Sequence, residues 1–334
     1  MKAMLLRKTA NINTNPLEYA DLEMPSPGYG EVLMKVKACG VCRSNLQVIE
    51  GERGIPPKLP LIPGHEVVGI VTEVGEGVTS LAVGDRVGAQ PQFSVDNTCE
   101  YCVSGRENLC INSRRLGWSI DGGYAEYMIG YANHLHKVPE NISDIEAAPL
   151  FCPGATAYRA VSTAEPFPGK KIAVFGIGGV GHLAIEFAKI SGARVTAVSR
   201  SPMHVSLAEK VGADRAIISS EEDPVSVIMK DGGVDSSIVF APSDEAVSQA
   251  VRSTKKGGTI VIGVDCKIGD FKFMNGQTIK STVVGTRNDI NKVLELASLG
   301  LVKISAAEYK LKDANEALRL LKENKVEGRI VLTM

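Results

Sequence analysis

Hydrophobic and polar positions follow two different patterns along the chain. Up to about residue 150, short apolar runs alternate with glycine and proline residues, as in Val32–Val36, Val67–Val71 and Arg86–Ala89. Short apolar runs bounded by turn residues predict strands. We therefore expect a mostly β domain in the first half of the chain.

From about Phe167 the pattern becomes a regular alternation of strand and helix. A buried strand at Lys171–Phe175 precedes a helix at Val180–Ser191 and a strand at Arg194–Val198. This alternation predicts an α/β domain with a doubly wound parallel sheet. Further predicted elements are a helix at Val205–Val211 and strands at Arg215–Ile218, Ser236–Phe240, Thr259–Val264 and Thr282–Gly285.

The alternation stops near Asn288. The helical segment Ile290–Ser298 and the final apolar run Gly328–Leu332 are expected to return to the first domain. We therefore predict a first domain of residues 1–150, completed by 289–334, and a dinucleotide-binding second domain of residues 151–288.

Composition narrows the classes of function. A chain of 334 residues suits two domains, and a net charge of -1 without a basic block makes nucleic-acid binding unexpected. There is no apolar run of membrane-spanning length and no signal peptide, so we expect a cytoplasmic protein without a membrane partner. Seven cysteines, an odd number, favour metal ligands and reduced thiols over disulfides.

A cluster of three cysteines and one aspartate predicts a structural zinc site. Asp96 precedes Cys99 by the same step that separates Cys99 from Cys102, and Cys110 follows. Such spacing closes a tetrahedral shell from one loop, with no open position for a substrate. The alternative is a set of surface thiols beside an ordinary loop aspartate.

A glycine-rich motif predicts a dinucleotide site. Gly176-Ile177-Gly178-Gly179-Val180-Gly181 matches G-x-G-x-x-G between a strand and a helix, where backbone amides bind a pyrophosphate. At the end of the next strand, Ser199-Arg200-Ser201 replaces the acidic residue of NAD-specific sites. Arg200, helped by His204, is expected to bind a 2′-phosphate, so we predict NADP(H) in preference to NAD(H). The alternatives are a plain tight turn and a solvated surface arginine.

Three further ligand candidates, Cys42, His65 and Cys152, lie far apart in sequence. Catalytic zinc commonly has three protein ligands and one open position. Spacing alone does not establish such a site, because a lone cysteine is usually a small buried hydrophobe.

A resemblance to a known family connects these three residues. Gly64-His65-Glu66-Val67-Val68-Gly69 resembles the zinc signature of medium-chain alcohol dehydrogenases. The segments 39–44, 121–127 and 152–158 are similar to other segments of that family, so the resemblance covers the whole chain. It implies a GroES-like catalytic domain, a Rossmann domain, and a homodimer or homotetramer.

The resemblance also implies the site and the reaction. Cys42, His65 and Cys152 would bind a catalytic zinc, the second zinc of the chain, and Glu66 would be a carboxylate that can bind it when water is absent. Ser44 would hydrogen-bond the substrate oxygen. The implied reaction is hydride transfer between NADP(H) and a primary or secondary alcohol, aldehyde or ketone, with zinc as the Lewis acid. Further expected cofactor contacts are Arg43, Thr156, Gly263, Val264 and Arg329.

Two residues depart from the family pattern. Gln47 replaces a proton-relay histidine and cannot titrate, so the proton would leave by another route. Asn45 replaces an aspartate, and its amide oxygen is expected to accept from the distal N–H of His65. Trp118 is expected near the substrate. The alternatives are a polyol or sugar dehydrogenase of the same superfamily and a cofactor-binding protein without catalysis.

Overall fold

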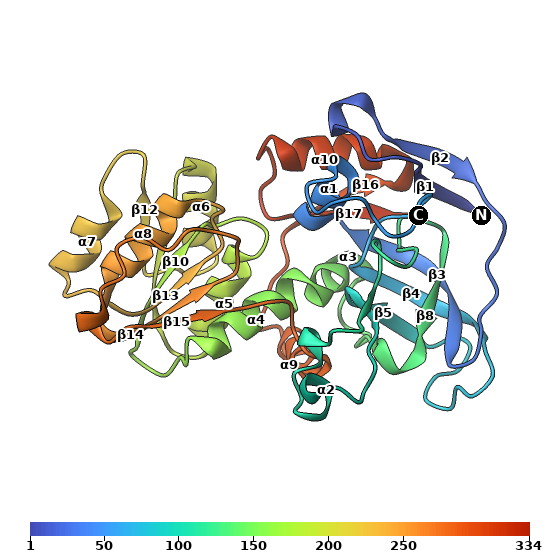
Figure 1. Cartoon of the computed structure of the whole chain (residues 1–334), viewed down its shortest axis with the longest axis horizontal. Helices are drawn as coiled ribbons and strands as arrows, with labels where there is room; N and C mark the ends of the chain where they lie inside the picture. Colours follow the sequence, from blue (N-terminus) through green and yellow to red (C-terminus); the bar gives the residue numbers. More distant parts are fainter. The chain divides into compact units, whose positions relative to one another are not determined.

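The computed structural model describes residues 1–334, and the chain forms two compact units (Figure 1). Unit 1 comprises Met1–Cys152, Thr286–Ser298 and Ile304–Met334. Unit 2 comprises Pro153–Gly285 and Leu299–Lys303. Each unit is therefore assembled from segments that are distant in sequence.

Unit 2 is built on a six-stranded parallel sheet. Its strands are β10 (Lys171–Phe175), β11 (Arg194–Ser199), β12 (Arg215–Ile218), β13 (Val234–Val239), β14 (Thr254–Ile262) and β15 (Thr278–Ser281). The order across the sheet is β12-β11-β10-β13-β14-β15, which is the 3-2-1-4-5-6 order of a doubly wound nucleotide-binding sheet. The predicted α/β fold class is confirmed.

One helix precedes the first of these strands and the others connect them, as Figure 1 shows. They are α4 (Pro153–Thr163), α5 (Gly181–Ile190), α6 (Pro202–Lys210), α7 (Pro224–Lys230) and α8 (Asp244–Ser253), with the short 3-10 helix η5 (Phe273–Asn275) before β15. Four of the five residues of β10 are buried, as expected for a central parallel strand covered on both faces.

The last predicted strand of unit 2 is wrong by several residues. The sequence predicts Thr282–Gly285, whereas β15 ends at Ser281. Val284 has a φ of 41°, so the chain has left the extended conformation there, and the apolar Val283 beside it is 44% exposed. Apolar character at these two positions does not reflect pairing in the sheet.

Unit 1 is mostly β. Its seven-stranded sheet follows the order β16-β17-β3-β4-β5-β9, with β8 also paired to β3. These strands are β3 (Glu31–Gly40), β4 (Val67–Val74), β5 (Arg86–Ala89), β8 (Tyr127–Tyr131), β9 (Leu135–Lys137), β16 (Ala306–Lys310) and β17 (Arg329–Thr333). β17 pairs antiparallel with β3, so the C-terminal segment is part of the same sheet.

Smaller elements surround this sheet. Two-stranded sheets are formed by β1 (Lys2–Leu6) with β2 (Leu17–Asp21) and by β6 (Gln92–Ser94) with β7 (Arg114–Arg115). The helices of unit 1 are α1 (Arg43–Glu50), α2 (Glu100–Val103), α3 (Asp144–Ala147), α9 (Arg287–Ser298) and α10 (Ala314–Lys322). The 3-10 helices are η1 (Ile12–Thr14), η2 (Glu107–Leu109), η3 (Ala132–His134), η4 (Ala148–Phe151) and η6 (Leu311–Asp313).

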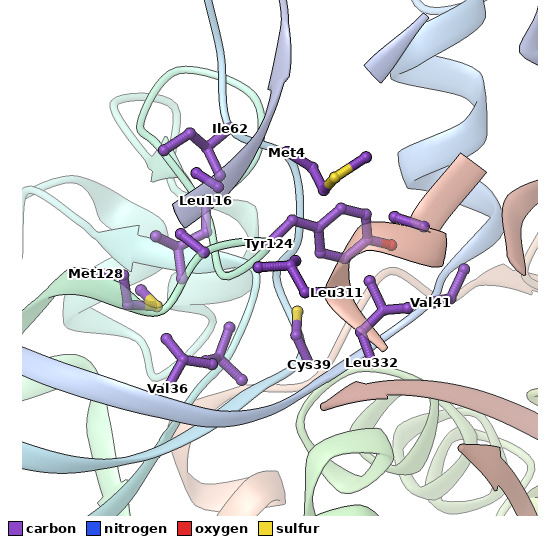
Figure 2. Packing of buried hydrophobic residues seen from close by; sticks show 14 of the residues in the cluster. Met4, Val36, Cys39, Val41, Ile62, Leu116, Tyr124, Met128, Leu311 and Leu332 are labelled. Carbon is purple, nitrogen blue, oxygen red and sulfur yellow. The ribbon is translucent and has the colours of Figure 1, made fainter. Parts of the chain in front are cut away.

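A buried hydrophobic cluster supports the segment that precedes β4. Figure 2 shows Tyr124 packed with Met4 and Leu311, with the Cys39 sulfur directed into the same cluster. Gly64 has a φ of 102°, and a Cβ there would lie 2.6 Å from the Tyr124 ring. Glycine at this position therefore lets the chain pass close to Tyr124 just before His65.

None of the helices combines the length and the apolar character that crossing a bilayer would require.

Candidate active site and metal centres

Unit 1 brings four of the predicted ligands together. Cys42 directly precedes α1, His65 and Glu66 precede β4, and Cys152 follows η4. One donor atom of each residue lies within 4.8 Å of those of the other three. Glu66 is fully buried and His65 is 6% exposed, whereas the two cysteines are half-buried. The cluster therefore lies mostly inside the unit, and Cys42 and Cys152 are its two partly exposed residues.

Hydrogen bonds connect the donor atoms. The bond between Cys152 and Cys42 lowers the pKa of Cys42 well below its usual range and raises that of Cys152. Burial lowers the pKa of His65, but its hydrogen bond to Cys42 and the Cys42 charge outweigh burial, so the pKa is raised. The Ser44 hydroxyl donates to Cys42 Sγ at 3.1 Å and lies 3.4 Å from His65 Nε2. Two sulfurs and one nitrogen thus converge, with a hydroxyl beside them.

Arg329 of β17 contacts Glu66. Its Nη2 lies 2.8 Å from each carboxylate oxygen and donates to the Val41 carbonyl at 3.0 Å. The Arg329 side chain is 4% exposed. Burial raises the pKa of Glu66, and the positive charge of Arg329 opposes that rise. Glu66 therefore has an ionic partner within the protein, and the contact of Arg329 with a pyrophosphate stays a prediction.

The Asn45 amide presents its nitrogen to His65, whereas the prediction was that it presents its oxygen. Its amide nitrogen Nδ2, not its oxygen, lies 3.0 Å from His65 Nδ1. The oxygen Oδ1 accepts from the Cys42 backbone N–H at 3.2 Å and from the Tyr124 hydroxyl at 3.4 Å. The predicted acceptor role toward His65 is wrong because these two donors already engage the oxygen.

Gln47, the residue in place of a relay histidine, accepts from Arg53 Nε at 2.9 Å. Its side chain therefore has a local structural partner.

The second cluster lies in the loop that contains α2. One donor atom each of Asp96, Cys99, Cys102 and Cys110 lies within 4.8 Å of the others. Asp96 Oδ1 accepts from the backbone N–H groups of Thr98 and Cys99, both at 2.9 Å, and Oδ2 accepts from Asn112 Nδ2 at 2.8 Å. The amides of Cys99 and Thr98, followed by Asn112, hold the pKa of Asp96 far below its usual range. The sequence reasoning missed this role of Asn112. The only sequence signal for it is that Asn112 follows the predicted ligand Cys110 by two positions.

In unit 2 the glycine-rich turn joins β10 to α5. A Cβ at Gly176 would lie 2.4 Å from the Ala241 nitrogen, and one at Gly181 would lie 2.0 Å from the Gly176 carbonyl oxygen. A Cβ at Gly178 would meet no atom within 4 Å. The first and last glycines thus allow close packing, while the middle one borders open space that ligand atoms can occupy.

His182 is a further residue of this turn that the sequence reasoning left without a role. It is fully buried, and its Nδ1–H donates to the Gly178 carbonyl at 2.8 Å. Its position one residue after the glycine motif is the signal that could have found it.

The remaining predicted cofactor residues of unit 2 follow strand ends or begin helices. Ser199 ends β11, and its Oγ accepts from the Ser201 N–H at 3.3 Å. Arg200 is exposed, and its carbonyl accepts from the Ser220 hydroxyl at 3.3 Å. The others are Thr156 in α4, Gly179 and Val180 in the glycine-rich turn, His204 in α6, and Gly263 and Val264 after β14. Arg43, in unit 1, is the exposed first residue of α1.

Comparison with known proteins identifies the family. Residues 28–140 match the family described as alcohol dehydrogenase GroES-like domain, and residues 179–298 match the zinc-binding dehydrogenase family. An alcohol dehydrogenase of Geobacillus stearothermophilus is 43% identical over 324 residues, which cover 95% of this chain and 96% of that protein.

Solved structures agree with this assignment. An NAD-dependent alcohol dehydrogenase has a TM-score of 0.93 at 29% identity, with 100% of both chains covered. A zinc-binding dehydrogenase of Sinorhizobium meliloti 1021, solved with NADP, has a TM-score of 0.90 at 29% identity, covering 100% of this chain and 99% of that one.

The chain belongs to the zinc-dependent medium-chain alcohol dehydrogenase family, as predicted. It is an oxidoreductase of the alcohol dehydrogenase class, and it combines a GroES-like domain with a Rossmann-type parallel sheet.

Proposed function

We propose that the protein is a zinc-dependent alcohol dehydrogenase that transfers hydride between NADP(H) and a primary or secondary alcohol or its carbonyl product. The observation that carries this proposal is the convergence of Cys42, His65 and Cys152 beside the Ser44 hydroxyl. Two sulfurs and one nitrogen match the donor set of catalytic zinc, which keeps a fourth position open.

Each side chain of the cluster would have a separate role in the reaction. When bound, zinc would supply a Lewis acid for the substrate oxygen and NADP(H) would supply the hydride acceptor or donor. Cys42, His65 and Cys152 would hold the metal. The Ser44 hydroxyl would turn from Cys42 Sγ to the substrate oxygen and receive its proton. Because Gln47 cannot titrate, the proton would continue to water from Ser44.

We propose a second zinc on Asp96, Cys99, Cys102 and Cys110. Three sulfurs and one carboxylate oxygen fill a tetrahedral shell, so this ion would stabilise the loop without binding substrate. Two backbone amides bind Asp96 Oδ1, whereas Oδ2 accepts from the Asn112 side chain, so Oδ2 is the oxygen that we expect to bind the metal.

The cofactor preference rests on the end of β11. No acidic side chain occupies positions 199–201, and the exposed Arg200 offers a guanidinium to a 2′-phosphate. The open space at Gly178 supports pyrophosphate binding at the start of α5. The structural relatives named above include one described as NAD-dependent and one solved with NADP, so the preference needs a direct test.

We also propose that the protein forms a homodimer or homotetramer. β15 is the last strand at its edge of the sheet, and an uncovered edge strand is a template for pairing with another chain. Phe273 and Met274, just before it, are 85% and 75% exposed. Light scattering after size-exclusion chromatography tests this proposal, and a monomer at micromolar concentration would contradict it. A cytoplasmic location stays a prediction.

The catalytic proposal is tested by metal content and turnover together. We expect two zinc ions per chain and NADPH oxidation with at least one member of a panel of aldehydes and ketones. Cys152→Ser should bind one zinc and lose measurable turnover. The matched control Cys266→Ser changes a cysteine outside both clusters and should keep both properties. NADPH binding with no zinc at the Cys42 cluster and no turnover would instead favour a cofactor-binding protein without catalysis.

Cofactor preference needs its own variant. Arg200→Ala should lower kcat/KM for NADPH relative to NADH by roughly tenfold or more, since a hydrogen bond to a charged group contributes about 1.5–3 kcal/mol. Arg194→Ala, which removes an exposed arginine from the other end of β11, is the matched control. An unchanged ratio in Arg200→Ala, or a wild type that prefers NADH, would overturn the preference.

A further inference from the structure

Asn45 makes three polar contacts from a position that is only 1% exposed. Its Oδ1 accepts from the Cys42 backbone N–H and from the Tyr124 hydroxyl, at 3.2 and 3.4 Å. Its Nδ2 donates to His65 Nδ1 at 3.0 Å. The side chain thus joins the start of α1, the buried Tyr124 and the imidazole of a proposed zinc ligand.

The orientation of this amide follows from its partners. A backbone N–H can only donate, so the group that faces Cys42 N must be the amide oxygen. Tyr124 is compatible with either orientation because a hydroxyl both donates and accepts. Turning the amide over would set its NH₂ group against the Cys42 N–H, and two donors would then face each other. In this arrangement the neutral His65 imidazole therefore accepts at Nδ1 and carries its proton on Nε2.

A neutral histidine that binds zinc through Nε2 carries its proton on Nδ1, and that N–H needs an acceptor. His65 Nε2 is the ring atom on the Ser44 side, and Nδ1 is the atom that faces Asn45. The amide has one oxygen, which faces Cys42 N–H, so the group that it turns to His65 Nδ1 is an NH₂ donor and not an acceptor. An aspartate could accept from both groups, since each of its two oxygens accepts.

We propose that Asn45 is a positioning residue that weakens zinc binding at Cys42, His65 and Cys152, so that this centre releases its metal at a free-zinc concentration that an aspartate at position 45 would withstand. This inference rests on the proposed function, in which that cluster binds zinc. Occupancy of the catalytic centre then responds to zinc availability, because loading requires the amide to release either the Cys42 N–H or the histidine N–H.

The test is a zinc titration of the full chain in metal buffers, with bound zinc measured by mass spectrometry. Asn45→Asp should lower the dissociation constant of the Cys42 cluster by about tenfold, the lower end of the range for changes in hydrogen-bond partners of metal ligands. The Asp96 cluster of the same molecules should be unchanged and serves as the internal reference. Asn13→Asp adds the same charge at an exposed position of unit 1 and should leave both sites unchanged.

A second measurement uses the wild type and does not depend on how the variant folds. Nitrogen-15 NMR of the imidazoles, at a pH high enough to keep His65 neutral and a zinc level that fills only the Asp96 cluster, should show His65 protonated on Nε2 and unprotonated on Nδ1. Zinc binding should move the proton to Nδ1. A proton on Nδ1 before zinc is added, or an equal or weaker zinc affinity in Asn45→Asp, would overturn the inference. A wild type that binds no zinc at the Cys42 cluster would instead refute the proposed function.

Discussion

The ion pair between Glu66 and Arg329 allows a quantitative test of how the proposed centre is held together. Glu66 is fully buried, Arg329 is 4% exposed, and both carboxylate oxygens lie 2.8 Å from one guanidinium nitrogen. Removing one partner of such a pair leaves an uncompensated buried charge, which costs about 3–5 kcal/mol. We expect Glu66→Gln and Arg329→Met each to lower the free energy of unfolding by about this amount.

The double variant separates the pair from its surroundings. With neither charge present no buried charge remains unpaired, so the loss should fall short of the sum of the two single losses by at least about 2 kcal/mol. Trp118 is the only tryptophan and lies in unit 1 with both partners. Its fluorescence during urea unfolding therefore reports on the unit that contains the pair.

A matched control uses the same two substitutions at an exposed pair of unit 1. Arg7 and Glu18 form an ion pair at 2.6 Å, and their side chains are 62% and 51% exposed. Glu18→Gln and Arg7→Met should show no measurable coupling, because exposed pairs are screened by solvent. Additive losses for Glu66→Gln and Arg329→Met would refute the reasoning, since they would mean that neither charge depends on the other.

Three further predictions concern a buried acid, the loop ligand and the missing relay. Burial raises the pKa of Glu186 from 4.5 to about 7, so the unfolded chain loses its proton first, and Glu186 by itself should contribute a loss of about 3 kcal/mol in the free energy of unfolding as pH rises from 4.5 to 7. Burial lowers the pKa of His134 to about 4, which changes stability in the opposite direction, so the quantity to measure by urea unfolding is the difference between wild type and variant. This difference should change by about 3 kcal/mol across the range for Glu186→Gln and stay constant for the exposed Glu209→Gln. Asp96→Asn retains an oxygen for the two backbone amides but loses the charge, so zinc content at pH 7 should fall toward one ion per chain; two ions would contradict the ligand assignment. Gln47→His should add a step near the usual histidine pKa of about 6.5 to the pH–rate profile, and an unchanged profile would exclude that position from the proton route.

Local patterns account for the parts of the fold that the sequence predicts well. The predicted bounds of β5, β10 and β12 match the observed ones, because each is an apolar run bounded by turn residues. The helices α7 and α8 were not predicted, since short amphipathic segments leave a weak apolar period. The return of Leu299–Lys303 to unit 2 has no local signal either.

The two proposed metal centres differ in the same way, since one is indicated by a local sequence pattern and the other depends on tertiary structure. Asp96 and Cys110 are 14 positions apart, so closing their loop costs little entropy and the spacing alone indicates a site. Cys42, His65 and Cys152 meet only because α1, β4 and η4 converge in the folded unit. Family resemblance was therefore needed to select them.

Contacts that control the proposed catalytic centre are the hardest to predict from sequence. Glu66 and Arg329 are 263 positions apart, and β17 brings them together by pairing with β3. The orientation of Asn45 depends on a backbone N–H, which no side-chain pattern reports. Sequence reasoning identified Asn45 as a departure from the family but assigned it the wrong hydrogen-bond sense. Choosing a metal ligand requires only residue type and spacing, whereas estimating how tightly that ligand is held requires the donors and acceptors around it, and those are set by tertiary structure.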